Sequence, residues 1–169
     1  MSYERIDESP LFDGAVRDSH EVRYRVASGF VEKGDLVLDA CCGTGYGRDL
    51  LGDCEYIGID RRPERRPYID HADFETGEGL REFGQDVFVG LEAIEHLDDE
   101  GVARFVEVAQ RSRRAIIVST PIVRNRNPHH KQQFTEADII ALFTDDTWRH
   151  YVTLYQGGLY GIFAFLRRA

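Results

Sequence analysis

The 169-residue sequence lacks the features of a membrane or secreted protein. No uninterrupted apolar run approaches the ~18 residues that a membrane span needs. The N-terminus, MSYERIDESP, is polar and acidic, unlike a secretory or transit signal. The three cysteines, Cys41, Cys42 and Cys54, are odd in number and form no C-x-x-C pair, which excludes a disulfide scaffold and a four-cysteine zinc site. We therefore expect a cytoplasmic protein with reduced thiols and no membrane contact.

Positive charge is also scarce. Lysine and arginine number 21 against 30 aspartates and glutamates, so the net charge is −9, and only Lys33 and Lys131 are lysine. Such a surface repels phosphate backbones unless a local basic patch dominates, which disfavours RNA as a partner. Hydrophobic residues make up 42% and charged residues 30%, values typical of a folded domain. We expect one domain over residues 1–169, with residues 1–14 as a flexible extension.

The pattern of apolar residues predicts an α/β sheet. Strand-like runs alternate with amphipathic stretches between residues 35 and 144. The predicted strands are 36–40, 56–60, one that begins at 68, 86–91 and 115–118, and the predicted helices are 15–31, a short one at 46–51, 98–110 and 135–143. In the first helix, Val22, Val26 and Phe30 would share one face, and Thr135 with Asp138 resembles a capping box at the start of the last.

Two connections of this sheet depart from the simple alternation. Only Arg61 to Pro67 joins the second and third strands, too few residues for the ~10–12 of a helical crossover. We therefore expect a shortened second crossover. The runs 148–155 and 159–166 flank Gln156-Gly157-Gly158, which predicts an antiparallel hairpin at the C-terminus.

A glycine-rich turn follows the first predicted strand and indicates a ligand site. The stretch Asp39 to Gly47 reads D-A-C-C-G-T-G-Y-G, a spacing that differs from the G-x-G-x-x-G of dinucleotide sites. Glycines there let a ligand approach the backbone closely. Because a phosphate beside Asp39 would be repelled, the better ligand has a cationic group and no pyrophosphate. Asp60, which ends the second strand, can accept hydrogen bonds from two ribose hydroxyls, which suggests a nucleoside without phosphates.

The residues from about 20 to 166 resemble a class I S-adenosylmethionine-dependent methyltransferase. Val37 to Gly45 resembles the first motif of that family, and His20 to Tyr24 is similar to the helix before it. The resemblance implies a Rossmann-like, mostly parallel sheet with a C-terminal antiparallel hairpin and helices on both faces. It also implies that Asp39, Gly43 and Gly45 line the methionine part of S-adenosyl-L-methionine, that Asp60 holds its ribose, and that Asp73 accepts a hydrogen bond from its adenine. The family often has a glycine where this chain has Cys41, so we expect the turn to be displaced there.

Glu92, Glu95 and His96 follow the fourth predicted strand, where an open parallel sheet places its ligand crevice. If this segment is helical, the three side chains converge. Two carboxylates and an imidazole suit a divalent metal such as Mg²⁺ or Mn²⁺, with His130 or His129 as a fourth ligand. The E-x-x-E-H pattern with a distant histidine resembles the metal-dependent small-RNA 2′-O-methyltransferases and the quinone-biosynthesis O-methyltransferases.

The same segment can also be interpreted without a metal ion, because E-H-L-like segments also occur in class I methyltransferases that bind no metal. Glu92 would then contact the cofactor region, Glu95 would cap a helix or pair with an arginine, and His96 would pack or act as a base. His96 or His130 could take a proton from an approaching hydroxyl, and a metal could lower the pKa of that hydroxyl instead; both routes favour oxygen as the acceptor. Arg124 and Arg126 could bind an anionic substrate or simply be solvated.

The sequence thus predicts an S-adenosylmethionine-dependent methyltransferase that acts on a small molecule at oxygen. Two alternatives stay open. One is a metal-dependent RNA 2′-O-methyltransferase, which the acidic charge and the lack of an RNA module disfavour. The other is a non-catalytic, cofactor-binding partner subunit, which the short connection between the second and third strands suggests.

Overall fold

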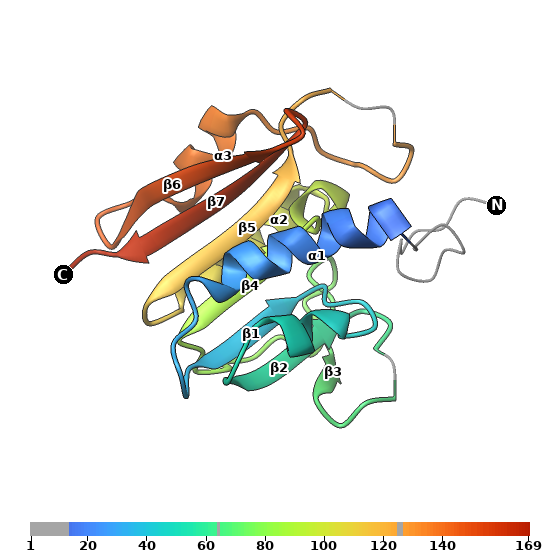
Figure 1. Cartoon of the computed structure of the whole chain (residues 1–169), viewed down its shortest axis with the longest axis vertical. Helices are drawn as coiled ribbons and strands as arrows, with labels where there is room; N and C mark the ends of the chain where they lie inside the picture. The colour runs from blue at the N-terminus through green and yellow to red at the C-terminus, as the bar shows by residue number, and fades with distance from the viewer. Residues whose placement is uncertain (1–13, 64, 125–126) are drawn as a thin grey trace.

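A computed structural model describes residues 14–63, 65–124 and 127–169 of the chain. These residues contain a seven-stranded sheet with the strand order β3-β2-β1-β4-β5-β7-β6 (Figure 1). The strands are β1 (Leu36–Ala40), β2 (Glu55–Asp60), β3 (Ile69–His71), β4 (Val87–Leu91), β5 (Ala115–Pro121), β6 (Trp148–Gln156) and β7 (Tyr160–Arg167).

The sheet has the mixed topology that the sequence predicts. The pairs β1–β2, β1–β4, β2–β3 and β4–β5 are parallel, whereas β7 pairs antiparallel with both β5 and β6. The order of the strands reverses between β1 and β4, and in such sheets a ligand binds where the carboxyl ends of the two strands diverge. The expected Rossmann-like fold with a C-terminal antiparallel hairpin is therefore confirmed.

Helices cover both faces of the sheet, because successive strand residues point to opposite sides. On one face α1 (Gly14–Ser28) and the 3₁₀ helix η2 (Tyr46–Leu50) pack on strand residues such as Val37 and Val89. On the other face α2 (Asp99–Gln110) and α3 (Glu136–Phe143) pack on residues such as Leu38 and Phe88. Figure 1 shows α1 in front of the strands and α2 and α3 behind them. A second 3₁₀ helix, η3 (Ile94–His96), follows β4.

Three local features can be compared with the predictions from the sequence: the cap of α3, the connection between β2 and β3, and the apolar face of α1. The capping box is present, since the Thr135 side chain accepts from the amide of Asp138 and the Asp138 side chain accepts from the amide of Thr135. The described residues between β2 and β3 contain no helix, as expected from the short connection. The predicted apolar face of the first helix is partly wrong: α1 ends at Ser28, so Phe30 lies beyond it, and Val22 is 42% exposed.

The predicted N-terminal extension lies outside the described residues except for Gly14, which begins α1. Within the described ranges, no helix is both long and apolar enough to cross a membrane.

Candidate functional site

The carboxyl ends of β1, β2, β4 and β5 meet at one edge of the sheet, and the backbone is strained there. In the part of the chain that the structure describes, two residues other than glycine have a positive φ. Cys41 (φ 57°) directly follows β1, and Glu92 (φ 52°) directly follows β4. Residues in this left-handed region cost of order 1–3 kcal/mol and gather at functional sites. Both strained residues therefore border the point where the strand order reverses.

The glycine turn after β1 is built for close approach. Gly43 and Gly45 have φ values of 60° and 74°, which favour glycine. A Cβ on Gly45 would lie 2.8 Å from Ile69 Cδ1, and one on Gly47 would lie 2.1 Å from Tyr24 Cε1. Cys41, where the family often has glycine, takes the left-handed conformation itself, so the chain accepts strain at that position.

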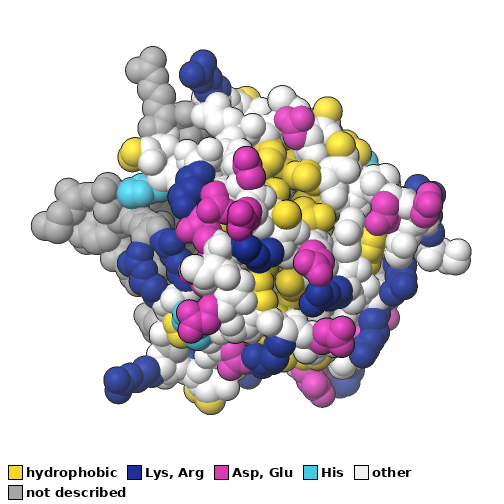
Figure 2. Space-filling view, turned by 180° about the vertical axis from the view of Figure 1, so that it is seen from behind, with side chains coloured by type: hydrophobic (Ala, Val, Ile, Leu, Met, Phe, Trp, Pro, Cys, Tyr) yellow, Lys and Arg dark blue, Asp and Glu magenta, His cyan; other side chains and the backbone are white. Residues whose placement is uncertain are grey.

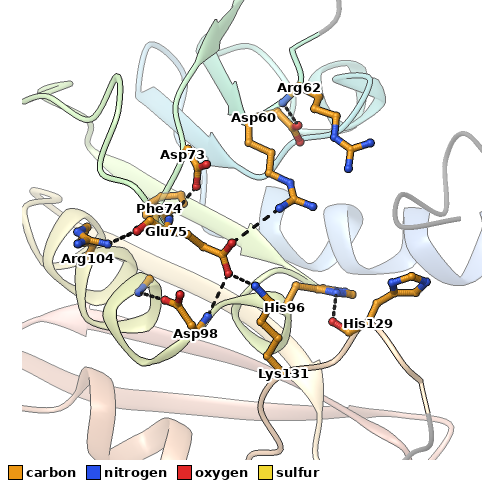
Figure 3. Close-up of polar contacts among 12 residues, drawn as sticks. Asp60, Arg62, Asp73, Phe74, Glu75, His96, Asp98, Arg104, His129 and Lys131 are labelled. Carbon is orange, nitrogen blue, oxygen red and sulfur yellow. Dashed lines mark hydrogen bonds and ion pairs between the residues drawn. The ribbon is translucent and has the colours of Figure 1, made fainter.

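Asp60, at the end of β2, is bonded to this turn. The amide of Gly43 donates to Asp60 Oδ2 at 3.0 Å. The amide of Arg62 donates to Asp60 Oδ1 at 2.8 Å, as Figure 3 shows. The side chain is 6% exposed. The carboxylate therefore joins the ends of β1 and β2 at the place where the sequence predicts a bound nucleoside.

Asp39, which the family resemblance assigns to the methionine part of the cofactor, lies near the end of β1. It is completely buried and accepts hydrogen bonds from Tyr56 Oη at 2.7 Å and from Tyr24 Oη at 3.1 Å. Burial raises its pKa from 3.8 to about 7, against the two tyrosine hydrogen bonds, which lower it. The Asp39 carboxyl group is thus buried at the start of the glycine turn, where two tyrosine hydroxyls donate hydrogen bonds to it.

Asp73 lies in the loop that follows β3, the strand beside β2. Its Oδ1 accepts a hydrogen bond from the amide of Glu75 at 2.8 Å (Figure 3). The side chain is half-buried. Asp60 ends β2 and Asp73 follows the neighbouring β3, in the order that the family resemblance implies.

The segment after β4 is not the helix that would bring Glu92, Glu95 and His96 together. Only Ile94–His96 form a 3₁₀ turn, and the left-handed backbone of Glu92 turns its side chain elsewhere. Glu92 Oε1 accepts from Ser119 Oγ at 2.9 Å and lies 3.7 Å from Nε of the buried Arg23. Arg23 in turn stacks on the ring of Tyr160 at 4.3 Å.

Glu95, His96 and His130 do come together. One potential ligand atom from each lies within 4.8 Å of the others, and Glu92 is not part of this group. Glu95 is 1% exposed; its Oε2 accepts from Thr120 Oγ1 at 3.1 Å, whereas its Oε1 has no hydrogen-bond partner. His96 Nδ1 lies 3.1 Å from the carbonyl oxygen of His129 (Figure 3), a contact that places the proton on Nδ1 and leaves Nε2 as a ligand.

The loop that supplies His130 is anchored to Glu95 itself. The amides of Lys131 and Gln132 donate to the carbonyl of Glu95 at 2.8 and 3.0 Å. These two bonds hold the loop against Glu95, and His130 rather than His129 belongs to the cluster. A small pocket beside it is lined by Glu95, Pro121, Val123, His130, Gln132 and Gln133. Arg124 is exposed, and Arg126 lies outside the described residues.

The electrostatics of the cluster suit a cation. Burial raises the pKa of Glu95, and the nearby Glu92 raises it further. Burial also raises the pKa of Glu92, against the opposing effect of Arg23. Burial lowers the pKa of His96, and that of His130 falls to about 4 because of burial and the two neighbouring histidines. The imidazoles are therefore neutral near pH 7. With the unpartnered oxygen of Glu95, they fit a divalent metal, and two histidines with one carboxylate suit a transition metal.

Sequence reasoning assigned no role to four residues at this edge: Tyr24 and Tyr56, which donate to Asp39, and Ser119 and Thr120, which donate to the two glutamates. Ser119 and Thr120 end β5, so their position at the carboxyl edge was a usable signal. Tyr24 lies in the segment His20 to Tyr24 that resembles the family, but no local signal paired Tyr24 or Tyr56 with Asp39, because they lie 15 and 17 residues from it in sequence.

Curated proteins of similar sequence are named probable S-adenosylmethionine-dependent methyltransferases. No family model matches the chain. A protein from Mycolicibacterium smegmatis, named a probable S-adenosylmethionine-dependent methyltransferase, is 33% identical over 130 residues, which cover 63% of this chain and 49% of that protein. The chain thus spans about half the length of the curated relatives it matches.

Solved structures share the fold at low identity. An N1-methyltransferase from Burkholderia thailandensis, solved with 1,6-didemethyltoxoflavin and S-adenosylhomocysteine, has a TM-score of 0.70 at 12% identity, over 89% of this chain and 79% of its own. A small RNA methyltransferase has a TM-score of 0.65 at 18% identity, over 99% of this chain and 27% of its own. The chain is thus similar in sequence to proteins named probable S-adenosylmethionine-dependent methyltransferases, and it shares its fold with methyltransferases of known structure.

Proposed function

We propose that the chain is a methyltransferase that binds S-adenosylmethionine and methylates a hydroxyl oxygen of a small molecule. The observation that supports this most directly is the bond between Asp60 and the amide of Gly43, which joins the ribose-binding acid to the glycine turn at the point where the strand order reverses. The Glu95–His96–His130 group lies on the same edge, after β4 and β5.

In this proposal the cofactor lies across the ends of β1, β2 and β3. Asp60 binds the ribose hydroxyls, and Asp73 accepts from the adenine amino group. Gly43 and Gly45 leave room for the methionine part. Asp39 acts indirectly, because its buried carboxylate holds Tyr24 and Tyr56 beneath the turn.

Methyl transfer then needs alignment and the removal of one proton. The methyl–sulfur bond breaks as the methyl–oxygen bond forms, the sulfonium becomes a neutral thioether, and the hydroxyl proton must leave. His96 and His130 are the candidate proton acceptors, but a pKa of about 4 makes His130 a weak base. We therefore propose that Glu95, His96 and His130 hold a divalent cation, which when bound would lower the pKa of the acceptor hydroxyl.

A small-molecule acceptor is supported by the acidic net charge of the whole chain and by the small pocket beside the Glu95–His96–His130 group. The net charge is −9, and on the face shown in Figure 2 the described acidic and basic side chains are interspersed, with no continuous basic patch. The pocket beside Glu95 and His130 has six lining residues. RNA 2′-O-methylation and cofactor binding without turnover are the alternatives that the experiments distinguish.

The test of cofactor binding is calorimetric titration with S-adenosylhomocysteine. We expect the wild type to bind and Asp60→Asn to bind at least about tenfold more weakly, since the ribose loses a charged hydrogen-bond partner. Glu107→Gln is the matched control, because the exposed side chain of Glu107 in α2 pairs with Arg111 and lies far from the turn in sequence. A folded wild type that does not bind would refute the proposal.

The test of the metal and the acceptor uses labelled S-adenosylmethionine. We expect methylation of small hydroxyl compounds to be lost on chelation and restored by Mn²⁺ or Mg²⁺, and Glu95→Gln to abolish this metal dependence. Activity that is indifferent to chelator would contradict the metal part of the proposal. Metal-dependent methylation of oligonucleotides would support the RNA alternative, and turnover only with an added protein would support the partner-subunit alternative.

A further inference from the structure

Glu75 lies at the centre of a set of polar contacts that links four separate segments (Figure 3). It follows Asp73 in the loop after β3, and its side chain is 19% exposed. Its backbone is fixed on both sides: the amide donates to Asp73, and the carbonyl accepts from Arg104 Nη1 of α2 at 2.6 Å. The side chain therefore projects from a well-anchored backbone.

The carboxylate of Glu75 contacts three further segments. Oε2 lies 3.8 Å from Nη1 of Arg61, in the loop after β2. Oε1 accepts from the amide of Asp98, the residue that caps α2, at 3.3 Å. Oε1 also accepts from Nζ of Lys131, in the loop after β5. One carboxylate thus lies between two cations that come from opposite halves of the sheet edge.

The two cations are next to residues of the proposed site. Arg61 directly follows Asp60, and Lys131 directly follows His130. Lys131 is held to the cluster by its own backbone, since its amide donates to the carbonyl of Glu95 at 2.8 Å. A path of bonded contacts therefore runs from Asp60, through Arg61, Glu75 and Lys131, to His130.

We propose that Glu75 is a positioning residue that couples the cofactor side of the edge to the loop that bears His130. The inference rests on the proposed function, since the ligand that acts on Asp60 and Asp73 is the cofactor. A nucleoside that binds both acids orders the loops after β2 and β3, and so fixes Arg61 and Glu75 relative to each other. The Glu75 carboxylate then holds Lys131 and residues 127–134 in the geometry that brings His130 to Glu95 and His96.

The charge of Glu75 is the essential property. Without it, Lys131 loses the carboxylate that it contacts, and its side chain, which is 47% exposed, is free to turn into solvent. Glu75→Gln keeps the size of the side chain and an oxygen for the amide of Asp98, but removes the charge. Lys131→Met breaks the same bridge from its other end.

The experiment is hydrogen exchange of residues 127–134 with and without S-adenosylhomocysteine. In the wild type we expect the product to slow exchange there by about fivefold or more. In Glu75→Gln and Lys131→Met, at saturating product, exchange in this loop is expected to be within about twofold of the ligand-free rate. The double variant should show no larger effect than either single one, because both changes remove one bridge. Glu107→Gln, which removes an unrelated exposed pair, should behave as the wild type.

A second readout is the affinity for Mn²⁺. We expect the product to strengthen Mn²⁺ binding to the wild type by about fivefold, and Mn²⁺ to strengthen product binding by the same factor, because coupling is reciprocal. This coupling should vanish in Glu75→Gln. Thermal unfolding shows whether Glu75→Gln is folded. If it is not, the same measurement is made on Lys131→Met.

Product binding that protects the loop equally in the wild type and in both variants overturns the coupling and leaves the proposed function intact. If the wild type binds the product but its loop is not protected, the coupling is also overturned and the proposed function is kept. A wild type that does not bind the product overturns both proposals.

Discussion

The buried carboxyl of Asp39 predicts an unusual pH dependence of stability. Asp39 is completely buried with two tyrosine hydroxyls as partners, and burial raises its pKa from 3.8 to about 7. The folded protein therefore holds a proton at Asp39 that the unfolded chain releases near pH 4. The stability from this site is fully present below about pH 4 and is lost as the pH rises towards about 7.

The size of the effect follows from the two pKa values. At about 1.4 kcal/mol per pH unit, the difference between 3.8 and about 7 corresponds to a loss of about 4 kcal/mol when the site is fully ionised. Asp39→Asn removes the ionisation and keeps an oxygen that can accept from Tyr56. A tyrosine hydroxyl left without its partner adds a cost of about 1–3 kcal/mol that does not vary with pH.

The assay is urea unfolding of the wild type and of Asp39→Asn across the range from about pH 4 to about pH 8, without cofactor. We expect the difference in the free energy of unfolding between the two proteins to shift in favour of Asp39→Asn by up to about 4 kcal/mol over this range. Other titrating groups cancel in the difference. A difference that stays constant within about 0.5 kcal/mol would refute the reasoning, because Asp39 would then ionise equally in both states.

Three further substitutions test the packing and the backbone. Thr135→Ala removes the cap of α3 and should lower the free energy of unfolding by about 1 kcal/mol in urea titration, whereas an unchanged midpoint would contradict the capping role. Gly47→Ala places a Cβ 2.1 Å from Tyr24 and should cost about 1–3 kcal/mol; a neutral result would mean that α1 shifts freely. Cys41→Gly should be more stable than Cys41→Ala by about 1 kcal/mol, since φ at this position is 57°, and the reverse order would show that the left-handed backbone is not strained.

Local features of the sequence were sufficient to predict most elements of the fold. The alternation of apolar residues placed β1 and β4 within one residue of their observed ends, and Thr135 with Asp138 marked the start of α3. These signals depend on near neighbours in the chain, so they can be interpreted without knowing the tertiary structure. The glycine spacing likewise identified the turn, because glycines there allow a ligand to approach the backbone; Gly43 and Gly45 also have positive φ values, which glycine adopts readily.

The chemical state of the site was decided by contacts between distant segments. Asp39 is buried because Tyr24 and Tyr56, 15 and 17 residues away in the chain, donate to it. Glu92 lies outside the Glu95–His96–His130 group because a left-handed backbone turns it towards Arg23 and Ser119.

By itself, the sequence determined the order of strands and helices, the glycine turn, and the positions of Asp39 in β1, Asp60 at the end of β2 and Asp73 after β3, since each of these depends on the local pattern of residues. Only the tertiary structure decided that His130 rather than His129 reaches Glu95, through two backbone bonds to the Glu95 carbonyl, and that Glu75 lies between Arg61 and Lys131. The physical reason is that hydrogen-bond partners and desolvation depend on which segments pack together, and residues separated by dozens of positions meet only when the sheet has formed.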